Sequence, residues 1–462
     1  MINNRLESWI KLLYLSTIHI NILKMKSIYK ILFALVLLPL VNIHGQKTGT
    51  QPGDSLSLHE ILNEVILNYP SIKKAQSDIE YSDAKIGLAK SAYLPDVNVT
   101  SSYTRLGPTQ SITIPNMGSF QLYPANNYTA MLNINETIYY FGKTDKNVTF
   151  EKQNKELVGF SVDQLKQKLS GMMIGNYYTI VLLQEAIRIK EEELATLNEH
   201  LNFVQKKEAT GSATKYEILT TKVRISAIEN QKTDLLTALE IQQSQLNSFL
   251  GKSQDTKLVV KKELLASQIF ASNDSLFSFA FDHRNEMKIA RQKSTLADIH
   301  LKMVNSQNNP TLNFFGSGGL KNGYLPDINV ITPNYAVGVG IKIPIFDGSR
   351  SKYTRIQANS DIRGNALETE MTRRTIVNEV VESRANAGSA LKKVAQSELQ
   401  LEQAQQAYSL AETNYNAGVI TNLDLLDSYT SLAESKLALL KTKIDYSASL
   451  LKLKIALGEK IY

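Results

Sequence analysis

The chain has 462 residues, of which 43% are hydrophobic, 21% are charged and none is cysteine. Without cysteine, a disulfide scaffold and a cysteine-ligated zinc site are both excluded. The formal net charge of +7 is small against 51 basic and 44 acidic side chains, so the sequence lacks the basic excess of a nucleic-acid-binding protein.

The N-terminal region has the pattern of a secretory signal peptide. From Met25 onward, two early lysines precede an apolar run over 31–41, and a small residue, glycine, follows at position 45. The run is shorter than the roughly 20 apolar residues that cross a membrane. We therefore expect an upstream extension over 1–24 and a cleaved signal peptide over 25–45, with an uncleaved anchor as the alternative.

Alternating apolar and polar residues predict two pairs of β-strands. The first pair is predicted at about 96–104 and 128–138, and the second at about 311–317 and 334–345. Their lengths approach the 9 to 11 residues of a transmembrane β-strand. The segments that join each pair are rich in Pro, Gly, Asn and Ser and are predicted to be loops.

Two very long helices are predicted after these strand pairs, over 143–207 and 349–416. Neither stretch contains proline, and helix-forming residues dominate both. A helix of about 60 residues is roughly 90 Å long, far beyond a typical globular helix. Apolar residues step by three and four, as at Leu194, Leu197 and Leu201, which favours a coiled coil or a helical tube.

Each long helix is expected to end at a glycine turn and to be followed by a returning helix. Gly211 and Gly418 suit the left-handed residue that ends a helix, and Thr214 and Thr421 suit the N-cap of the next. The helical hairpins then cover 143–250 and 349–457. Since one turn aligns with the other, we interpret residues 46–250 and 251–462 as two structural repeats with helix-strand-strand-helix-helix order.

Four strands cannot close a barrel, and an open sheet edge in lipid leaves backbone groups without hydrogen bonds. The chain is therefore expected to oligomerise. Two copies would give eight strands with a filled interior, whereas three copies would give twelve strands and a lumen.

The chain resembles the TolC-type outer membrane efflux protein family, also called outer membrane factors. The resemblance is carried by the duplicated element order and by the segment 415–427, and more weakly by 345–348 and 140–142. It covers essentially all of 46–462. The family implies a mainly α fold with a transmembrane β-barrel. It also implies a homotrimer with a twelve-stranded barrel in the outer membrane, and a twelve-helix tube across the periplasm whose tip stays closed until a pump docks.

No catalytic, cofactor or metal site is predicted. The six histidines are dispersed, and no two of them have a metal-binding spacing. Gly338-Val339-Gly340 resembles part of a dinucleotide fingerprint, but it lies inside an alternating strand, where small residues that face a lumen explain it better. We therefore expect no enzyme activity and no cofactor.

Asp424 and Asp427 are the most informative carboxylates, three residues apart at the start of the last long helix. The simpler interpretation is favourable charge at a helix N-terminus, worth about 0.3 to 1 kcal/mol. The resemblance instead implies an aperture ring of aspartates that narrows the channel. Glu217, at the duplicated position, and Tyr415 are expected to be gating partners across neighbouring hairpins, because a phenol can donate a hydrogen bond to a carboxylate. The family often has an arginine where this chain has Ile420, so an arginine latch at that position is not expected.

The turns themselves are predicted to form the adaptor-docking tip. Their residues are small or weakly polar, although a bare solvated turn is the alternative. This predicted docking surface consists of Gly211, Ser212, Ala213, Gly418, Val419 and Ile420.

The leading functional hypothesis is a passive exit duct of a tripartite efflux or type I secretion system. Its expected partners are a periplasmic adaptor (membrane fusion) protein, an inner-membrane pump and outer membrane lipid, and no nucleic acid. The alternative is a periplasmic or surface coiled-coil scaffold or adhesin without a channel, which would not need two strand pairs. Drug, metal and protein cargo are all compatible with the sequence.

Overall fold

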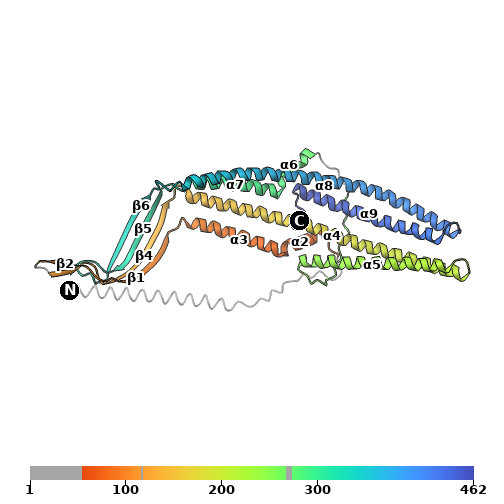
Figure 1. The fold of residues 1–462 in the computed structure, drawn as a ribbon, viewed down its shortest axis with the longest axis horizontal. Helices are drawn as coiled ribbons and strands as arrows, with labels where there is room; N and C mark the ends of the chain where they lie inside the picture. The colour runs from red at the N-terminus through yellow and green to blue at the C-terminus, as the bar shows by residue number, and fades with distance from the viewer. Residues whose placement is uncertain (1–54, 116–117, 267–272) are drawn as a thin grey trace, which may run out of the picture. The chain divides into compact units, whose positions relative to one another are not determined.

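The computed structural model describes residues 55–115, 118–266 and 273–462, and these contain all the elements discussed below (Figure 1). The signal peptide and the upstream extension predicted for 1–45 lie outside the described residues. Among the helices that are described, none is both long and apolar enough to cross a membrane.

Helices and strands alternate in the same order in the two halves of the chain. The first half contains α2 (Leu58–Asn68), α3 (Pro70–Ser91), β1 (Asp96–Arg105), β4 (Asn126–Tyr139), α4 (Lys143–Ala209) and α5 (Lys215–Leu250). The second half contains α6 (Asn273–His283), α7 (Asn285–Asn305), β5 (Thr311–Lys321), β6 (Thr332–Lys342), α8 (Arg350–Asn416) and α9 (Asn422–Leu457). Two helices, rather than one, precede each strand pair.

The long helices have matching lengths in the two halves. α4 and α8 each have 67 residues, and α5 and α9 each have 36. At 1.5 Å per residue, α4 and α8 are each about 100 Å long. Figure 1 shows α4 running beside α5, and α8 beside α9. Such equal lengths are what the duplication of one unit would produce.

The main hydrophobic core joins both halves. Its centre is formed by Met173, Ile174 and Tyr177 of α4, all of which are fully buried. The hydroxyl group of Tyr177 donates a hydrogen bond to the carbonyl oxygen of Lys261 at 2.5 Å. Residues from α2, α5 and α9 complete this core, namely Ile61, Leu62, Val65, Leu246, Leu250, Leu440, Ile444 and Leu451. The two halves therefore share one core.

The four longer strands form one antiparallel sheet in the order β1-β4-β5-β6. β4 pairs with β5, so the strand pairs of the two halves are joined in the middle of the sheet. Within the described residues, β1 and β6 are the two edges. Both carry exposed apolar side chains, such as Val97 and Val99 on β1 and Val337 and Val339 on β6.

The strands differ most from the sequence-based boundaries at the ends of β5 and β6. β5 continues to Lys321 rather than to 317, because the glycines that hide its alternation still pair through their backbones with β4. β6 ends at Lys342, before Pro344, which has no amide hydrogen to donate to the ladder. A Cβ atom at Gly338 would lie 2.3 Å from the outer edge of the Phe315 ring, so the glycine leaves room for that ring and packing within the sheet accounts for it.

The segment predicted as a loop over 105–127 contains a short hairpin. β2 (Ser111–Ile114) pairs with β3 (Gly118–Gln121) in a separate two-stranded sheet. The β-branched residues at 112–114 favour a strand, but the strand is only four residues long. A prediction based on the turn-forming residues around it therefore missed it.

Candidate functional site: the hairpin tips

Two tight turns end the long helices, and we call them with their flanking residues the hairpin tips (207–224 and 414–429). Gly211 and Gly418 both have φ of +74°, the left-handed conformation that glycine adopts without strain. The amide of Ser212 donates to the carbonyl oxygen of Lys207 at 2.8 Å, and the corresponding bond in the second turn has the same length. Both turns are thus closed by the same pattern of backbone hydrogen bonds.

Each returning helix begins with a capping box. The Glu217 carboxylate accepts hydrogen bonds from the amide and hydroxyl groups of Thr214, at 3.1 and 3.2 Å. Asp424 accepts the same two bonds from Thr421, at 2.9 and 2.6 Å. The bonds from Thr421 hold the pKa of Asp424 below its usual value. Asp424 therefore caps its own helix, whatever further role it has.

The structure brings together two of the predicted gating residues. The hydroxyl group of Tyr415 on α8 donates to Oε2 of Glu217 on α5 at 3.0 Å. Burial, reinforced by this carboxylate, raises the pKa of Tyr415 well above that of an exposed phenol. The phenol therefore stays protonated and remains a donor. One oxygen of Glu217 caps α5, while the other accepts the bond from α8.

A buried asparagine connects three helices behind this contact. Oδ1 of Asn422 lies 2.6 Å from Nε2 of His200 on α4, and its Nδ2 lies within 3.4 Å of three acceptors on α5. Those acceptors are the Glu217 carbonyl oxygen and the hydroxyl oxygens of Thr220 and Thr221. The spacing of the histidines does not predict this junction, because His200 meets Asn422 only when α4 packs against α9. The position of Asn422, directly after an N-cap, is the one local signal.

An arginine does contact one of the two aspartates, Asp427, and it comes from α5. Nη2 of Arg224 on α5 lies 2.6 Å from Oδ1 of Asp427 on α9. The Asp427 side chain is 61% exposed, so the contact is weak by the standard of buried pairs. The segment 415–427 lacks an arginine, and only the packing of α5 against α9 shows where one comes from. Asp424 and Asp427 are both exposed, on the first turns of α9.

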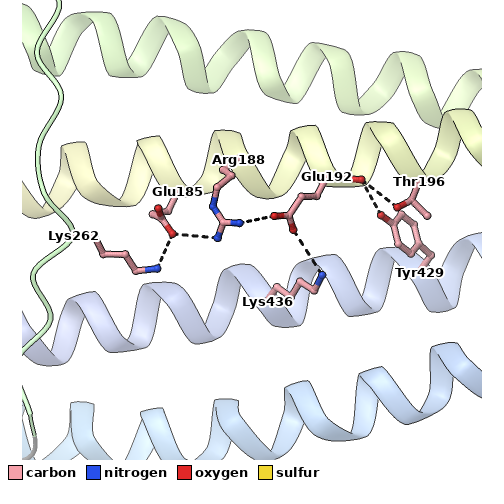
Figure 2. Close-up of polar contacts among 7 residues, drawn as sticks. All are labelled: Glu185, Arg188, Glu192, Thr196, Lys262, Tyr429 and Lys436. Atoms are coloured by element: carbon pink, nitrogen blue, oxygen red, sulfur yellow. Dashed lines mark hydrogen bonds and ion pairs between the residues drawn. The ribbon is translucent and has the colours of Figure 1, made fainter. Parts of the chain in front are cut away.

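A second set of polar contacts joins α4 to α9 away from the turns, and we call it the polar ladder (Figure 2). Glu185 accepts from Lys262 at 2.6 Å and lies 3.3 Å from Arg188, which in turn bonds Glu192 at 2.5 Å. Glu192 then lies 3.9 Å from Lys436 on α9. Burial opposes the ionisation of Glu185, but Lys262 and Arg188 outweigh it and hold its pKa below the usual value.

The ladder ends near the tips. The carbonyl oxygen of Glu192 accepts from the hydroxyl groups of Thr196 and Tyr429, at 3.2 and 3.5 Å (Figure 2). The first hairpin, α4 and α5, is therefore tied to the second, α8 and α9, at two levels. Within the residues described, no group of three or more histidine, aspartate or glutamate side chains is arranged to hold a metal ion.

Long helical hairpins joined to a small antiparallel sheet are the architecture that the sequence resemblance implies, and comparison with known proteins agrees. The chain matches the family model described as outer membrane efflux protein over residues 61–252 and 276–459. The chain belongs to this family.

Curated relatives resemble it along most of their length. The outer membrane protein TolC of Salmonella enteritidis is 18% identical over 410 residues, which cover 87% of this chain and 82% of the relative. The toluene efflux pump outer membrane protein TtgC of Pseudomonas putida is 23% identical over 418 residues, with 87% and 83% covered.

Solved structures have the same fold. The outer membrane protein VceC of Vibrio cholerae superposes with a TM-score of 0.72 at 18% identity, covering 88% of this chain and 97% of that one. The open state of the Neisseria gonorrhoeae outer membrane channel MtrE superposes with a TM-score of 0.71 at 16% identity, covering 87% of this chain and 89% of that one. The protein is an outer membrane exit duct for efflux, and the scaffold alternative is not favoured.

Proposed function

We propose that three copies of the chain assemble into the duct, each contributing four strands to a twelve-stranded barrel. The observation that carries this proposal is the sheet order, in which β1 and β6 are the edges among the described residues and have no strand partner there on their outer sides. In lipid each unpaired group would cost several kcal/mol, so the edges must meet other strands. Exposed apolar residues on both edge strands, such as Val99 and Val339, suit contact with acyl chains.

The helical hairpins of the three copies would form the periplasmic tube, with twelve helices around one passage. α4 and α8, each about 100 Å long, are long enough to extend far from a membrane. Transport through the tube is passive in this proposal, and the chain itself catalyses no reaction. An inner-membrane pump supplies the energy and a periplasmic adaptor protein joins the two.

The cargo proposed for this duct is small organic molecules. Relatives carry the names toluene efflux pump outer membrane protein, antibiotic efflux pump outer membrane protein and pyoverdine export outer membrane protein. All three names describe the export of small compounds. The pump rather than the duct would choose among them.

Two measurements on the purified full chain test the proposed assembly. Native mass spectrometry in detergent should give three chains per particle, and planar-bilayer recordings should show discrete conductance steps. A particle of one chain with no conductance would contradict the trimeric duct and favour a scaffold.

We further propose that the turns at the hairpin tips dock the adaptor. Both turns are exposed and carry small side chains, including Ser212 and Val419. Because the chain has no cysteine, Ser212→Cys and Val419→Cys can each be crosslinked without background. The matched control is Ala385→Cys, an exposed position in the middle of α8. Crosslinks to an adaptor from Ala385→Cys but from neither turn would contradict the docking site.

A further inference from the structure

A pocket lined by aromatic rings lies where α4 of the first hairpin meets α8 and α9 of the second. Its volume is about 260 Å³. The rings that line it belong to His200, Phe203, Tyr408, Tyr415 and Tyr429, and we call it the tyrosine pocket. Drug-sized sites have roughly 300 to 1,000 Å³, so this volume suits a smaller ligand.

Four of these rings form two tilted pairs. Tyr408 and Tyr429 lie 5.3 Å apart at 52°, and His200 and Tyr415 lie 5.5 Å apart at 59°. The faces of aromatic rings carry negative partial charge and attract cations. The ammonium group of Lys207 already uses this property, because its Nζ lies 4.8 Å from the ring centroids of both Phe203 and Tyr415.

Two carboxylates at the pocket give it negative charge. Glu199 and Glu412 both line it and both are exposed at its rim. In the described part of the chain, no lysine, arginine or histidine nitrogen lies within 4.0 Å of either carboxylate. Burial, reinforced by Glu412, raises the pKa of Tyr408 to about 12, so the phenol is neutral and adds no charge of its own. Glu199 and Glu412 therefore give the lining negative charge, part of which Lys207 balances.

We propose that the tyrosine pocket binds a small organic cation, with its ammonium group against the tyrosine rings and Glu199 and Glu412 balancing its charge. Aromatic faces combined with carboxylates select quaternary ammonium groups over neutral molecules of the same shape. The occupant would contact α4, α8 and α9 at once. The inference concerns a single chain and does not depend on the proposed trimer or adaptor.

Isothermal titration calorimetry of the purified full chain with choline tests the proposal. The neutral carbon isostere 3,3-dimethyl-1-butanol is the matched ligand, since it differs from choline mainly in charge. We expect saturable binding of one choline per chain and at least tenfold weaker binding of the alcohol. Equal binding of both ligands, or no choline binding, would overturn the proposal.

Variants of the pocket residues provide a second test of the proposed cation binding. The double variant Glu199→Gln, Glu412→Gln keeps side-chain shape and should weaken choline binding about tenfold, because it removes both charges that face the cation. The control Glu402→Gln, at an exposed site on α8 outside the pocket, should leave choline binding unchanged. Lys207→Gln removes a competing cation and should tighten binding, so weaker or unchanged binding in a folded Lys207→Gln protein would also overturn the proposal.

Discussion

Tyr415 shows how much of the tip depends on single side chains. Its hydroxyl bond to the Glu217 carboxylate, at 3.0 Å, is a direct side-chain link between α8 and α5. We expect Tyr415→Phe to lower the free energy of unfolding by up to about 1.5 to 3 kcal/mol, the range for a hydrogen bond to a charged group. Thermal unfolding in detergent, followed by circular dichroism, measures this.

Tyr216→Phe is the control for that substitution. Tyr216 lies near the first turn and is 69% exposed, and its hydroxyl group makes no hydrogen bond within the described residues. It should unfold like the parent protein. If Tyr415→Phe also matched the parent, the Tyr415 to Glu217 contact would not contribute to the tip.

Asp347, between β6 and α8, makes stability depend on pH. Its carboxylate accepts hydrogen bonds from the Ser351 side chain, from Asn308 at 2.9 Å and from the Ser351 amide at 3.0 Å, and these bonds lower its pKa to about 2. An unfolded aspartate titrates near 4. The folded state therefore takes up this proton at a lower pH than the unfolded state does. The stabilisation of the folded state by these hydrogen bonds is present above about pH 4 and is lost as the pH falls towards 2.

Asp347→Asn should flatten the fall in unfolding temperature between about pH 4 and pH 2. Asp361→Asn, at an exposed site on α8 whose carboxylate accepts no hydrogen bond in the described chain, is the control and should keep the parent slope. If the unfolding temperature of Asp347→Asn fell with pH as steeply as that of the parent protein, other carboxylates would account for the acid sensitivity.

The sequence predicted some of these residues and not others, for a physical reason. Glu217 and Tyr415 are predictable because the duplication aligns Glu217 with Asp424 and because a phenol such as Tyr415 can donate to a carboxylate. His200, Asn422 and Arg224 were missed because their roles arise only when α4, α5 and α9 pack together. Asp424 combines both cases, since its capping bond to Thr421 is local but its position relative to other copies is not.

The helix turns rest on backbone conformation more than on side chains. Any residue with a Cβ atom is strained at the positive φ of Gly211 and Gly418. We expect Gly211→Ala and Gly418→Ala each to destabilise the protein by about 1 to 2 kcal/mol, which thermal unfolding will show.

A glycine-to-alanine substitution inside α8 should instead stabilise the protein. Gly388 lies inside α8, and a Cβ atom added there would meet nothing within 4 Å. Gly388→Ala should therefore stabilise the chain by about 0.5 to 1 kcal/mol. Destabilisation by Gly388→Ala would indicate that another chain packs closely against this position.

At the scale of elements, the predictable parts are those with long, regular patterns. α4 and α8 were located to within a few residues, because neither contains proline and both end at glycine turns. β2 and β3 were missed because four residues are too few to show alternation. The pairing of β4 with β5 links segments about 180 residues apart in the chain, and local sequence carries no information about it.

At the scale of the whole molecule, the proposed trimer would bring three copies of Asp424 and Asp427 around one passage. About six carboxylates at the narrowest section would attract cations and slow their passage. The structure changes how this is best tested. Asp424 caps α9, so replacing it by alanine would damage the helix end as well as remove charge.

The double variant Asp424→Asn, Asp427→Asn avoids that problem, because asparagine also forms helix caps and keeps the side-chain shape. In planar bilayers it should reduce block by divalent cations relative to the parent channel, since the carboxylates that bind them are gone. Asp234→Asn, on α5 about 20 residues after the first turn, removes one exposed charge per chain outside the tip and should leave the block unchanged.

Arg224→Gln tests the same carboxylates by removing the positive charge beside Asp427. Arg224 neutralises part of the Asp427 charge through its 2.6 Å contact, so its loss should leave that carboxylate unpaired and strengthen divalent-cation block. A ring of carboxylates that lines the passage requires these opposite responses from the aspartate and arginine variants. Unchanged block in both variants would mean that Asp424 and Asp427 act only as charges at the start of α9, Asp424 as a helix cap and Asp427 as the partner of Arg224.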